Sequence, residues 1–250
     1  MIELKNINYT FQKGTVNETK ALSEINLTIK SGEFVVLIGS NGSGKSTLMN
    51  SLADTVIPDS GKILVDGIDA TNLPEHKRCK WIARLFQNPL LGTAPDLSVL
   101  ENFRLAALRT QKKGLQIGTG KKFRDEVADH VGALGLDLEK KLDQPVGTLS
   151  GGQRQAMTLS MAVMDEAKIL LMDEPTAALD PKTSEVFMKL AKRVIAERRL
   201  TCILITHQLK DALNYGNRLI LLREGKIIHD IQGDKKEKLT QNELFVWFGE

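Results

Sequence analysis

The sequence predicts an α/β fold built on a parallel β-sheet, and three short apolar runs are the main evidence. Residues 34–38, 169–172 and 202–206 are almost entirely apolar, which is typical of strands buried on both faces. Apolar residues at helical spacing precede the second run, within 156–163, and the third run, within 186–195. This alternation of helix and strand favours a parallel sheet with helices on its faces.

Length and composition fit one α/β domain, or a core with a subdomain. The chain has 250 residues, of which 42% are apolar and 26% charged, so it can form a sizeable core. The net charge of only +3 gives no indication of a nucleic-acid partner, and we expect none. Cys79 and Cys202 lack metal-ligand spacing and indicate a reducing, cytosolic compartment.

The N-terminal residues lack the pattern of a signal peptide. Apolar runs such as residues 34–38 are far shorter than the roughly 20 residues that cross a bilayer. We therefore expect a chain that does not span a membrane but can reach one through a partner.

The N-terminal part reads as β structure followed by a glycine-rich loop. Ile25, Leu27 and Ile29 alternate with polar residues, as in a half-buried strand. The buried run 34–38 then leads directly into Gly-x4-Gly-Lys-Ser, the P-loop pattern, which begins at Gly39. The pattern lies between a predicted strand and a predicted helix, which is the context that a P-loop requires.

Each part of this loop has a chemical reason to bind a nucleotide. Glycines let successive backbone N–H groups point at one phosphate chain, and the helix that follows directs its positive end at the same anion. We expect Lys45 to reach the β- and γ-phosphates of ATP and Ser46 to ligate Mg²⁺. The expected phosphate-binding set is Gly39, Ser40, Asn41, Gly42, Ser43, Gly44, Lys45, Ser46 and Thr47.

Two carboxylates follow the second buried run. Asp173 is expected to hold Mg²⁺, and Glu174 to act as general base or to position the attacking water. Ligands of open α/β sheets bind at the carboxyl ends of the strands. We therefore expect both carboxylates to share one site with the P-loop.

The middle of the chain has a different pattern. Residues 88–147 lack buried strand runs and carry apolar residues at helical positions, such as Leu100 and Phe103. This pattern predicts a helical subdomain inserted into the α/β core. Within it, residues 109–124 contain six basic and no acidic residues and form either a solvated loop or a surface for anionic lipid or a membrane partner.

A second anion-binding motif precedes a predicted helix. Leu149 is followed by Ser150, Gly151, Gly152 and Gln153, which combine a hydroxyl with free backbone N–H groups at a helix N-terminus. One chain does not need two such sites for one γ-phosphate. The motif is therefore expected to serve the ATP bound to another copy of the chain.

Together these motifs resemble those of the ABC ATPase family, in the family's order and over essentially the whole chain. Residues 39–47 match the Walker A loop, 149–153 the signature and 169–174 Walker B. The resemblance implies a P-loop NTPase fold, with a RecA-like parallel sheet, an N-terminal antiparallel β subdomain and an inserted α-helical subdomain. It also implies one ABC ATPase domain over 1–250, with 1–87 and 155–250 as the core and 88–154 as the helical subdomain.

The resemblance assigns further site residues. Gln87 matches the Q-loop glutamine that touches Mg²⁺ and water, Asp180 lies in the D-loop, and His207 matches the switch histidine beside the γ-phosphate. Glu174, His207 and Gln87 are thus the expected catalytic residues, and Ser46, Gln87 and Asp173 the expected metal ligands. Phe11 is the preferred ring for stacking on adenine, with Tyr9 as the alternative; packing is the other role open to either ring.

As a function, the resemblance implies an ATPase that forms a homodimer around two ATP and Mg²⁺. It would drive separate integral membrane permease subunits from the cytoplasmic face of the membrane, as a peripheral subunit. Uptake of a small, amino-acid-like solute with an extracytoplasmic substrate-binding protein is the preferred reading, and an exporter or lipid-extraction motor is the alternative. A soluble non-transport ABC ATPase is disfavoured, because the chain lacks a second cassette and a long coiled-coil insert.

Overall fold

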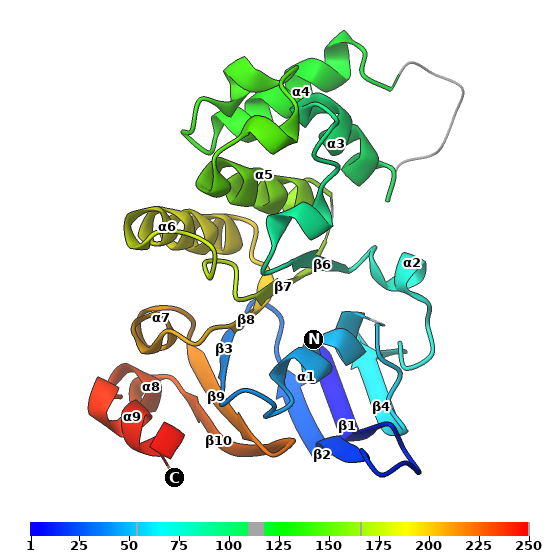
Figure 1. The fold of residues 1–250 in the computed structure, drawn as a ribbon, viewed down its shortest axis with the longest axis vertical. Coiled ribbons are helices and arrows are strands. Elements are labelled where there is room, and N and C mark those ends of the chain that lie inside the picture. Colours follow the sequence, from blue (N-terminus) through cyan, green and yellow to red (C-terminus); the bar gives the residue numbers. More distant parts are fainter. Residues whose placement is uncertain (54, 110–117, 166, 250) are drawn as a thin grey trace.

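The computed structural model describes residues 1–249 except 54, 110–117 and 166. Its helices and strands form a sheet-based part and a helical part, with helix α6 between them (Figure 1). Of the basic segment 109–124 that we expect as a loop, residues 110–117 lie outside the described residues. Residues 121–124 are not a loop but the start of helix α4 (Lys121–Gly132), because Phe123 packs on the apolar cluster of the helical part.

A six-stranded sheet forms the centre, in the order β10-β9-β3-β8-β7-β6. Its strands are β3 (Phe34–Ile38), β6 (Ile82–Leu85), β7 (Ile169–Asp173), β8 (Thr201–Ile205), β9 (Arg218–Arg223) and β10 (Lys226–Gln232). Strands β9, β3, β8, β7 and β6 pair in parallel, and only β10 is antiparallel to its neighbour. The predicted parallel core is confirmed, and the three apolar runs are its adjacent central strands.

Both faces of this sheet are buried. Val36, Leu170 and Leu204 belong to one apolar cluster, together with residues of α5 (Gly151–Val163), α6 (Pro181–Glu197) and α7 (Leu209–Asn214). Their chain neighbours point the other way and pack against α1 (Lys45–Ala53) and a second sheet. Burial on both sides explains why these strands are apolar at every position rather than at alternate ones.

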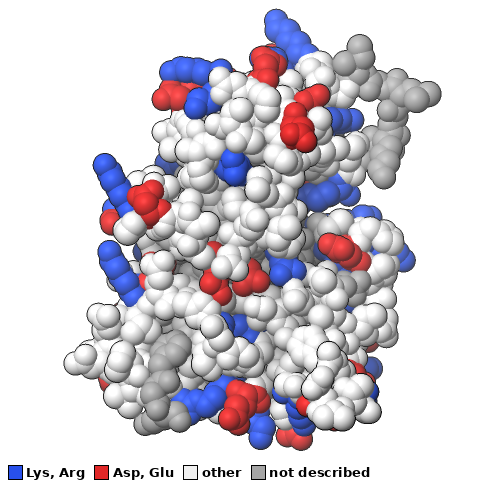
Figure 2. Space-filling view, viewed as in Figure 1, with Lys and Arg blue, Asp and Glu red and all other residues white. Residues whose placement is uncertain are grey.

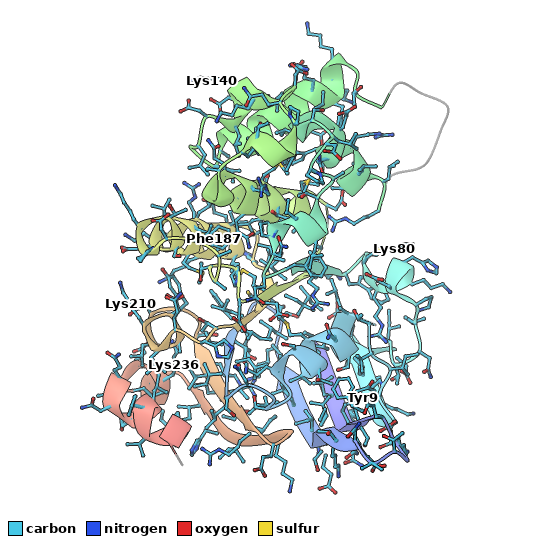
Figure 3. All side chains as sticks on the ribbon, viewed as in Figure 1. Tyr9, Lys80, Lys140, Phe187, Lys210 and Lys236 are labelled. Atoms are coloured by element: carbon cyan, nitrogen blue, oxygen red, sulfur yellow. The ribbon has the colours of Figure 1, made fainter. Side chains whose placement is uncertain are left out.

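The second sheet is antiparallel and lies at the N-terminal end of the chain. Its order is β2-β1-β4-β5, with β1 (Ile2–Phe11), β2 (Thr19–Ile29), β4 (Ser60–Val65) and β5 (Ile68–Asp69). Tyr9 lies in this sheet, whereas Phe187 lies on α6 across the central sheet (Figure 3). The expected N-terminal antiparallel subdomain is confirmed.

The helical part has an apolar cluster of its own. Phe103 of α3 (Val99–Ala107) and Val127 of α4 (Lys121–Gly132) pack with Met157 of α5. Other residues of α5, such as Leu159, belong to the cluster on the central sheet. Helix α5 is therefore shared by the two parts of the molecule and connects them.

The remaining helices are short. They are α2 (Glu75–Arg78), α8 (Asp234–Glu237), α9 (Gln241–Gly249) and three 3₁₀ turns at Pro89–Gly92, Leu138–Lys141 and Val146–Thr148. Acidic and basic side chains are interspersed over the face in Figure 2, as the small net charge predicts. Among the residues that the structure describes, no helix has the length and apolarity that crossing a membrane requires.

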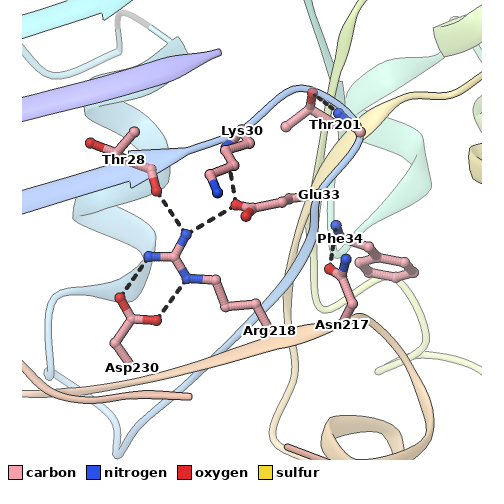
Figure 4. Close-up of polar contacts among 9 residues, drawn as sticks. Thr28, Lys30, Glu33, Phe34, Thr201, Asn217, Arg218 and Asp230 are labelled. Atoms are coloured by element: carbon pink, nitrogen blue, oxygen red, sulfur yellow. Dashed lines mark hydrogen bonds and ion pairs between the residues drawn. The ribbon is translucent and has the colours of Figure 1, made fainter. Parts of the chain in front are cut away.

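A buried arginine joins the two sheets (Figure 4). The Arg218 guanidinium donates to both carboxylate oxygens of Asp230 on β10, at 2.7 and 2.6 Å. It also donates to the carbonyl oxygen of Thr28 on β2 (2.7 Å) and to Glu33 in the turn before β3 (3.0 Å). The Arg218 side chain is 11% exposed, so these contacts are weakly screened by water.

We expect Arg218→Met to lower the free energy of unfolding by about 3 kcal/mol, because it leaves two carboxylates without their buried partner. Urea denaturation measures the change. As a control, Lys189→Met breaks the Lys189–Glu185 pair, whose side chains are 70% and 50% exposed, and is expected to cost less than about 1 kcal/mol. Equal losses in the two variants would contradict the bridging role of Arg218.

Candidate functional site

The P-loop lies between β3 and α1 and is held close to two other strands. A Cβ atom on Gly39 would lie 2.2 Å from the carbonyl oxygen of Leu222 on β9. One on Gly44 would lie 2.4 Å from the carbonyl oxygen of Ala21 on β2, and both glycines have positive φ angles. These two positions therefore accept only glycine, and the loop keeps its tight curve because its surroundings leave no space for a side chain.

Lys45 begins helix α1 and is buried beneath the loop. Its Nζ donates hydrogen bonds to the carbonyl oxygens of Gly39 (2.9 Å) and Ser40 (2.8 Å). Burial lowers the pKa of Lys45, and the nearby carboxylates of Glu174 and Asp173 oppose that shift. The ammonium group thus lies close to both carboxylates at the carboxyl end of β7, as the sequence predicts.

Asp173 and Glu174 lie at the carboxyl end of β7. Burial raises the pKa of Asp173, whereas the cations of Arg84 and Lys45 lower it. Glu174 adopts a left-handed backbone conformation with a φ of 45°, and its N–H donates to the carbonyl oxygen of Ile205 at 3.1 Å. This turn directs the Glu174 side chain toward the end of β8.

The structure brings Glu174 and His207 together. His207 follows β8, and its Nε2 lies 2.8 Å from Oε1 of Glu174. The two side chains are 38% and 21% exposed, so solvent reaches them. The pair comes from two adjacent parallel strands, which end at the same edge of the sheet as β3 and the P-loop.

The signature motif lies at the exposed start of α5. The Ser150 hydroxyl accepts from the Gln153 N–H, and the Gln153 side chain accepts from the Ser150 N–H, which together form a capping box. A Cβ atom on Gly152 would lie 2.4 Å from the Thr183 methyl group on α6. The motif is therefore pressed against α6 on one side while Ser150 and Gly151 stay exposed.

Asp180 caps helix α6 beside the signature. Its carboxylate accepts from the backbone N–H groups of Lys182 (3.1 Å) and Thr183 (3.0 Å). A hydrogen bond from the Thr183 side chain, followed by these backbone bonds, lowers the pKa of Asp180. Because Thr183 also limits the space beside Gly152, the D-loop and the signature form one continuous surface. The sequence places them 30 residues apart (180 − 150), so this proximity is a product of the fold.

The structure distinguishes the two candidate rings near the N-terminus. Tyr9 and Phe11 contact each other edge to face, with ring centroids 4.9 Å apart. Tyr9 packs against the apolar cluster of the two sheets, whereas Phe11 is 43% exposed. Phe11 is therefore the ring with a free face, and Tyr9 supports it from behind.

Gln87 lies exposed in the loop that leaves β6. No apolar run in the sequence predicts β6, because Ile82–Leu85 is only four residues long and contains Arg84. That arginine contacts Asp173, with Nη2 3.4 Å from Oδ2. A basic residue in a short strand carries no recognisable signal for such a contact.

The sequence of this chain matches a known family over most of its length. Residues 22–177 match the family described as ABC transporter. The chain belongs to the ABC transporter family. The family resemblance expected from the motifs and the P-loop NTPase fold are both confirmed.

Two relatives show how closely members of the family resemble this chain. A tyrosine transport ATP-binding protein of Clostridioides difficile (strain R20291) is 40% identical, over 99% of this chain and 98% of the relative. The energy-coupling factor transporter ATP-binding protein EcfA2 of Clostridium tetani (strain Massachusetts / E88) is 32% identical, over 92% of this chain and 78% of the relative.

Solved structures of ATP-binding cassettes have the same fold. A dimeric cassette in a post-hydrolysis state, bound to ADP and Pi, superposes with a TM-score of 0.80 at 31% identity, over 93% of this chain and 98% of that one. A cassette in its ADP conformation gives a TM-score of 0.81 at 27% identity, over 100% of this chain and 99% of that one. This chain is thus an ATP-binding and ATP-hydrolysing subunit of a transporter.

We expect Gly39→Ala to destabilise the protein by about 3 kcal/mol and to abolish tight ATP binding, because the new methyl group meets the Leu222 carbonyl oxygen. Gly42→Ala is the matched control in the same loop. Gly42 also has a positive φ, but open space surrounds the added Cβ, so only backbone strain of about 1 kcal/mol is expected. Chemical unfolding and titration with a fluorescent ATP analogue measure both effects; equal effects would contradict the close-approach account.

Proposed function

We propose that this chain closes as a homodimer over two ATP molecules and powers uptake of an amino-acid-like solute through a separate membrane permease. The observation that carries the proposal is the arrangement of the site. Lys45, Asp173, Glu174 and His207 converge at one edge of the sheet, while the signature at Ser150 is exposed on another part of the surface. A second copy of the chain supplies that signature to complete the site.

Within one chain, the phosphate-binding groups have distinct roles. The P-loop N–H groups and Lys45 hold the β- and γ-phosphates, and Phe11 stacks on adenine. Glu174 accepts a proton from the attacking water, and His207, 2.8 Å away, holds Glu174 and contacts the γ-phosphate. Gln87, at the junction with the helical part, senses whether the γ-phosphate is present and transmits this to the helical part.

The residues at the site fit Mg²⁺. Ser46 and Asp173 supply hard oxygen donors, and among the described residues no group of three or more His, Cys, Asp or Glu side chains forms a metal cage. Such a sparse set suits an ion that also binds phosphate oxygens and water. The ion would neutralise charge on the phosphates, and Gln87 is the third protein group assigned to it.

We infer that the signature surface of Ser150, Gly151, Gly152 and Gln153 binds the γ-phosphate of the partner's ATP, and that Asp180 lines the same interface. Support comes from the exposure of the start of α5 and from the continuous surface that it forms with the cap of α6. Hydrolysis then removes the group that holds the two copies together, which releases the closed state.

We also propose how the chain is divided. Residues 1–87 and 155–250 form the ATPase core, and 88–154 form the helical subdomain that carries the signature. The separate apolar cluster of the helical part supports this division. A cavity of about 490 Å³ lies where the parts meet, lined by Phe86, Leu91 and Leu105 among others. We propose that the permease docks in this cavity, because a partner bound there would be displaced by each movement of the helical part.

The direction of transport and the cargo are inferred from relatives. One relative is named for tyrosine transport and another for spermidine and putrescine import. We therefore propose import of an amino-acid-like solute, delivered by an extracytoplasmic substrate-binding protein. The chain would act as a peripheral subunit at the cytoplasmic face of the membrane, where ATP is available.

We expect Glu174→Gln to keep ATP affinity while lowering the rate of hydrolysis at least about 100-fold, since the amide cannot accept the proton. Phosphate release and ATP titration measure the two quantities, and gel filtration is expected to show an ATP-dependent dimer. Turnover near the wild-type rate would remove Glu174 from the role of general base.

The trapped Glu174→Gln variant also tests the transport proposal. Membranes solubilised with ATP and Mg²⁺ present are expected to yield a complex with a multi-span permease whose neighbouring gene encodes a substrate-binding protein. A permease without such a protein would contradict import. Recovery without any membrane protein would contradict the proposed permease coupling.

Ser150→Arg is expected to keep ATP binding but to lower hydrolysis at least about tenfold, because a bulky cation blocks closure over the partner's γ-phosphate. Asp129→Arg is the matched control, since it places the same side chain on an exposed position of α4. Steady-state ATPase rates and nucleotide titrations compare the variants. Unchanged turnover in Ser150→Arg would contradict the shared site.

A further inference from the structure

Arg84 is a half-buried cation beside the metal-binding carboxylate, and the function proposed above gives it no role. It lies on β6, next to β7 in the sheet, with its Nη2 3.4 Å from Oδ2 of Asp173. The two side chains are 17% and 16% exposed. Charge interactions at this burial are weakly screened, so the contact has a direct effect on what else Asp173 can bind.

The same guanidinium contacts the strand end that leads to Gln87. Its carbon Cζ lies 4.7 Å from the centroid of the Phe86 ring, which is the distance of a cation–π contact. Arg84 therefore touches both the metal-site carboxylate and the segment that joins the core to the helical part. Movement of the Arg84 guanidinium away from Asp173 therefore also alters its contact with the Phe86 ring.

Two buried polar atoms near Phe86 lack hydrogen-bond partners among the described residues. One is Nε of Arg84, a donor, and the other is Oε1 of Gln155, an acceptor. Gln155 is 1% exposed on α5, and its Nε2 donates to the carbonyl oxygen of Phe86 at 3.5 Å. Buried polar groups are normally satisfied, and here an unmatched donor and an unmatched acceptor belong to two side chains that both contact Phe86, so a shift of the guanidinium can bring them together.

Metal binding and the Arg84–Asp173 contact oppose each other. A divalent cation held by Asp173 repels a guanidinium at 3.4 Å from the same carboxylate, and the low local dielectric strengthens this repulsion. A metal ion at Asp173 therefore weakens the hold on Arg84. The displaced guanidinium keeps its stem on β6, within the cavity between the core and the helical part that it already lines.

We propose that Arg84 is a positioning residue that couples metal binding at Asp173 to the signature helix. When Arg84 leaves Asp173, its Nε donates a hydrogen bond to Oε1 of Gln155. This bond shifts helix α5, which carries Gln155. Because α5 begins at the signature, the metal state of one site adjusts the surface that the same chain presents to its partner's ATP. The inference rests on the proposed role of Asp173 as a metal ligand.

The first test measures metal affinity rather than activity. Mn²⁺ binding to the protein with a non-hydrolysable ATP analogue is titrated by electron paramagnetic resonance. Arg84→Met is expected to bind Mn²⁺ about fivefold more tightly, because a competing positive charge is gone. Arg84→Lys keeps the charge and is expected to stay near the wild type. Unchanged or weaker Mn²⁺ binding by a folded Arg84→Met variant would overturn the inference.

Asp173→Asn separates the two possible failures. If it does not weaken Mn²⁺ binding, Asp173 is not a metal ligand, and the assignment on which the inference rests fails. If it weakens binding while Arg84→Met has no effect, only the role of Arg84 fails.

The second test follows the link to α5. Arg84→Met and Gln155→Met are each expected to reduce the cooperativity of ATP hydrolysis, and the double variant to lose no more than either single variant. Additive losses of cooperativity would show that Arg84 and Gln155 act independently and would overturn the proposed coupling between them. Thermal unfolding of each variant checks that the fold is intact.

Discussion

Neighbouring parallel strands end at the same edge of a sheet, and the site depends on this constraint. Strands β3, β8 and β7 are adjacent, and a predicted site residue lies at or just after the carboxyl end of each. The P-loop with Lys45 follows β3, Glu174 follows β7 and His207 follows β8. Residues that are far apart in the sequence are therefore brought to one edge of the sheet by the strand order alone.

Rigid burial keeps this edge in place. Helices cover one face of the central sheet, α1 and the antiparallel sheet cover the other, and Arg218 joins the two sheets near the opposite ends of the strands. The helical part is attached differently, through α5, which packs in both apolar clusters. The signature therefore begins a helix that packs on the phosphate-binding core, so that a movement of one part would act on the other.

Local patterns were enough to predict the parallel core, the P-loop at Lys45 and the carboxylates at the end of β7, because each depends on residues close in sequence. Phe11 is preferred over Tyr9 for adenine stacking from the family resemblance, and this choice stays a prediction; the 43% exposure of the Phe11 ring is a property that no sequence pattern reveals. Arg84 was missed because β6 is too short to recognise and its partner is distant in the chain. Contacts of this kind follow from strand order, which a single sequence specifies poorly.

We propose above that each ATP is held by two copies of the chain. A structure of the Glu174→Gln variant with ATP and Mg²⁺ tests it most directly. We expect a two-fold symmetric dimer, in which the γ-phosphate lies between Lys45 of one copy and Ser150 of the other, within hydrogen-bond distance of both. A γ-phosphate enclosed by one chain, with the signature remote from every nucleotide, would contradict it.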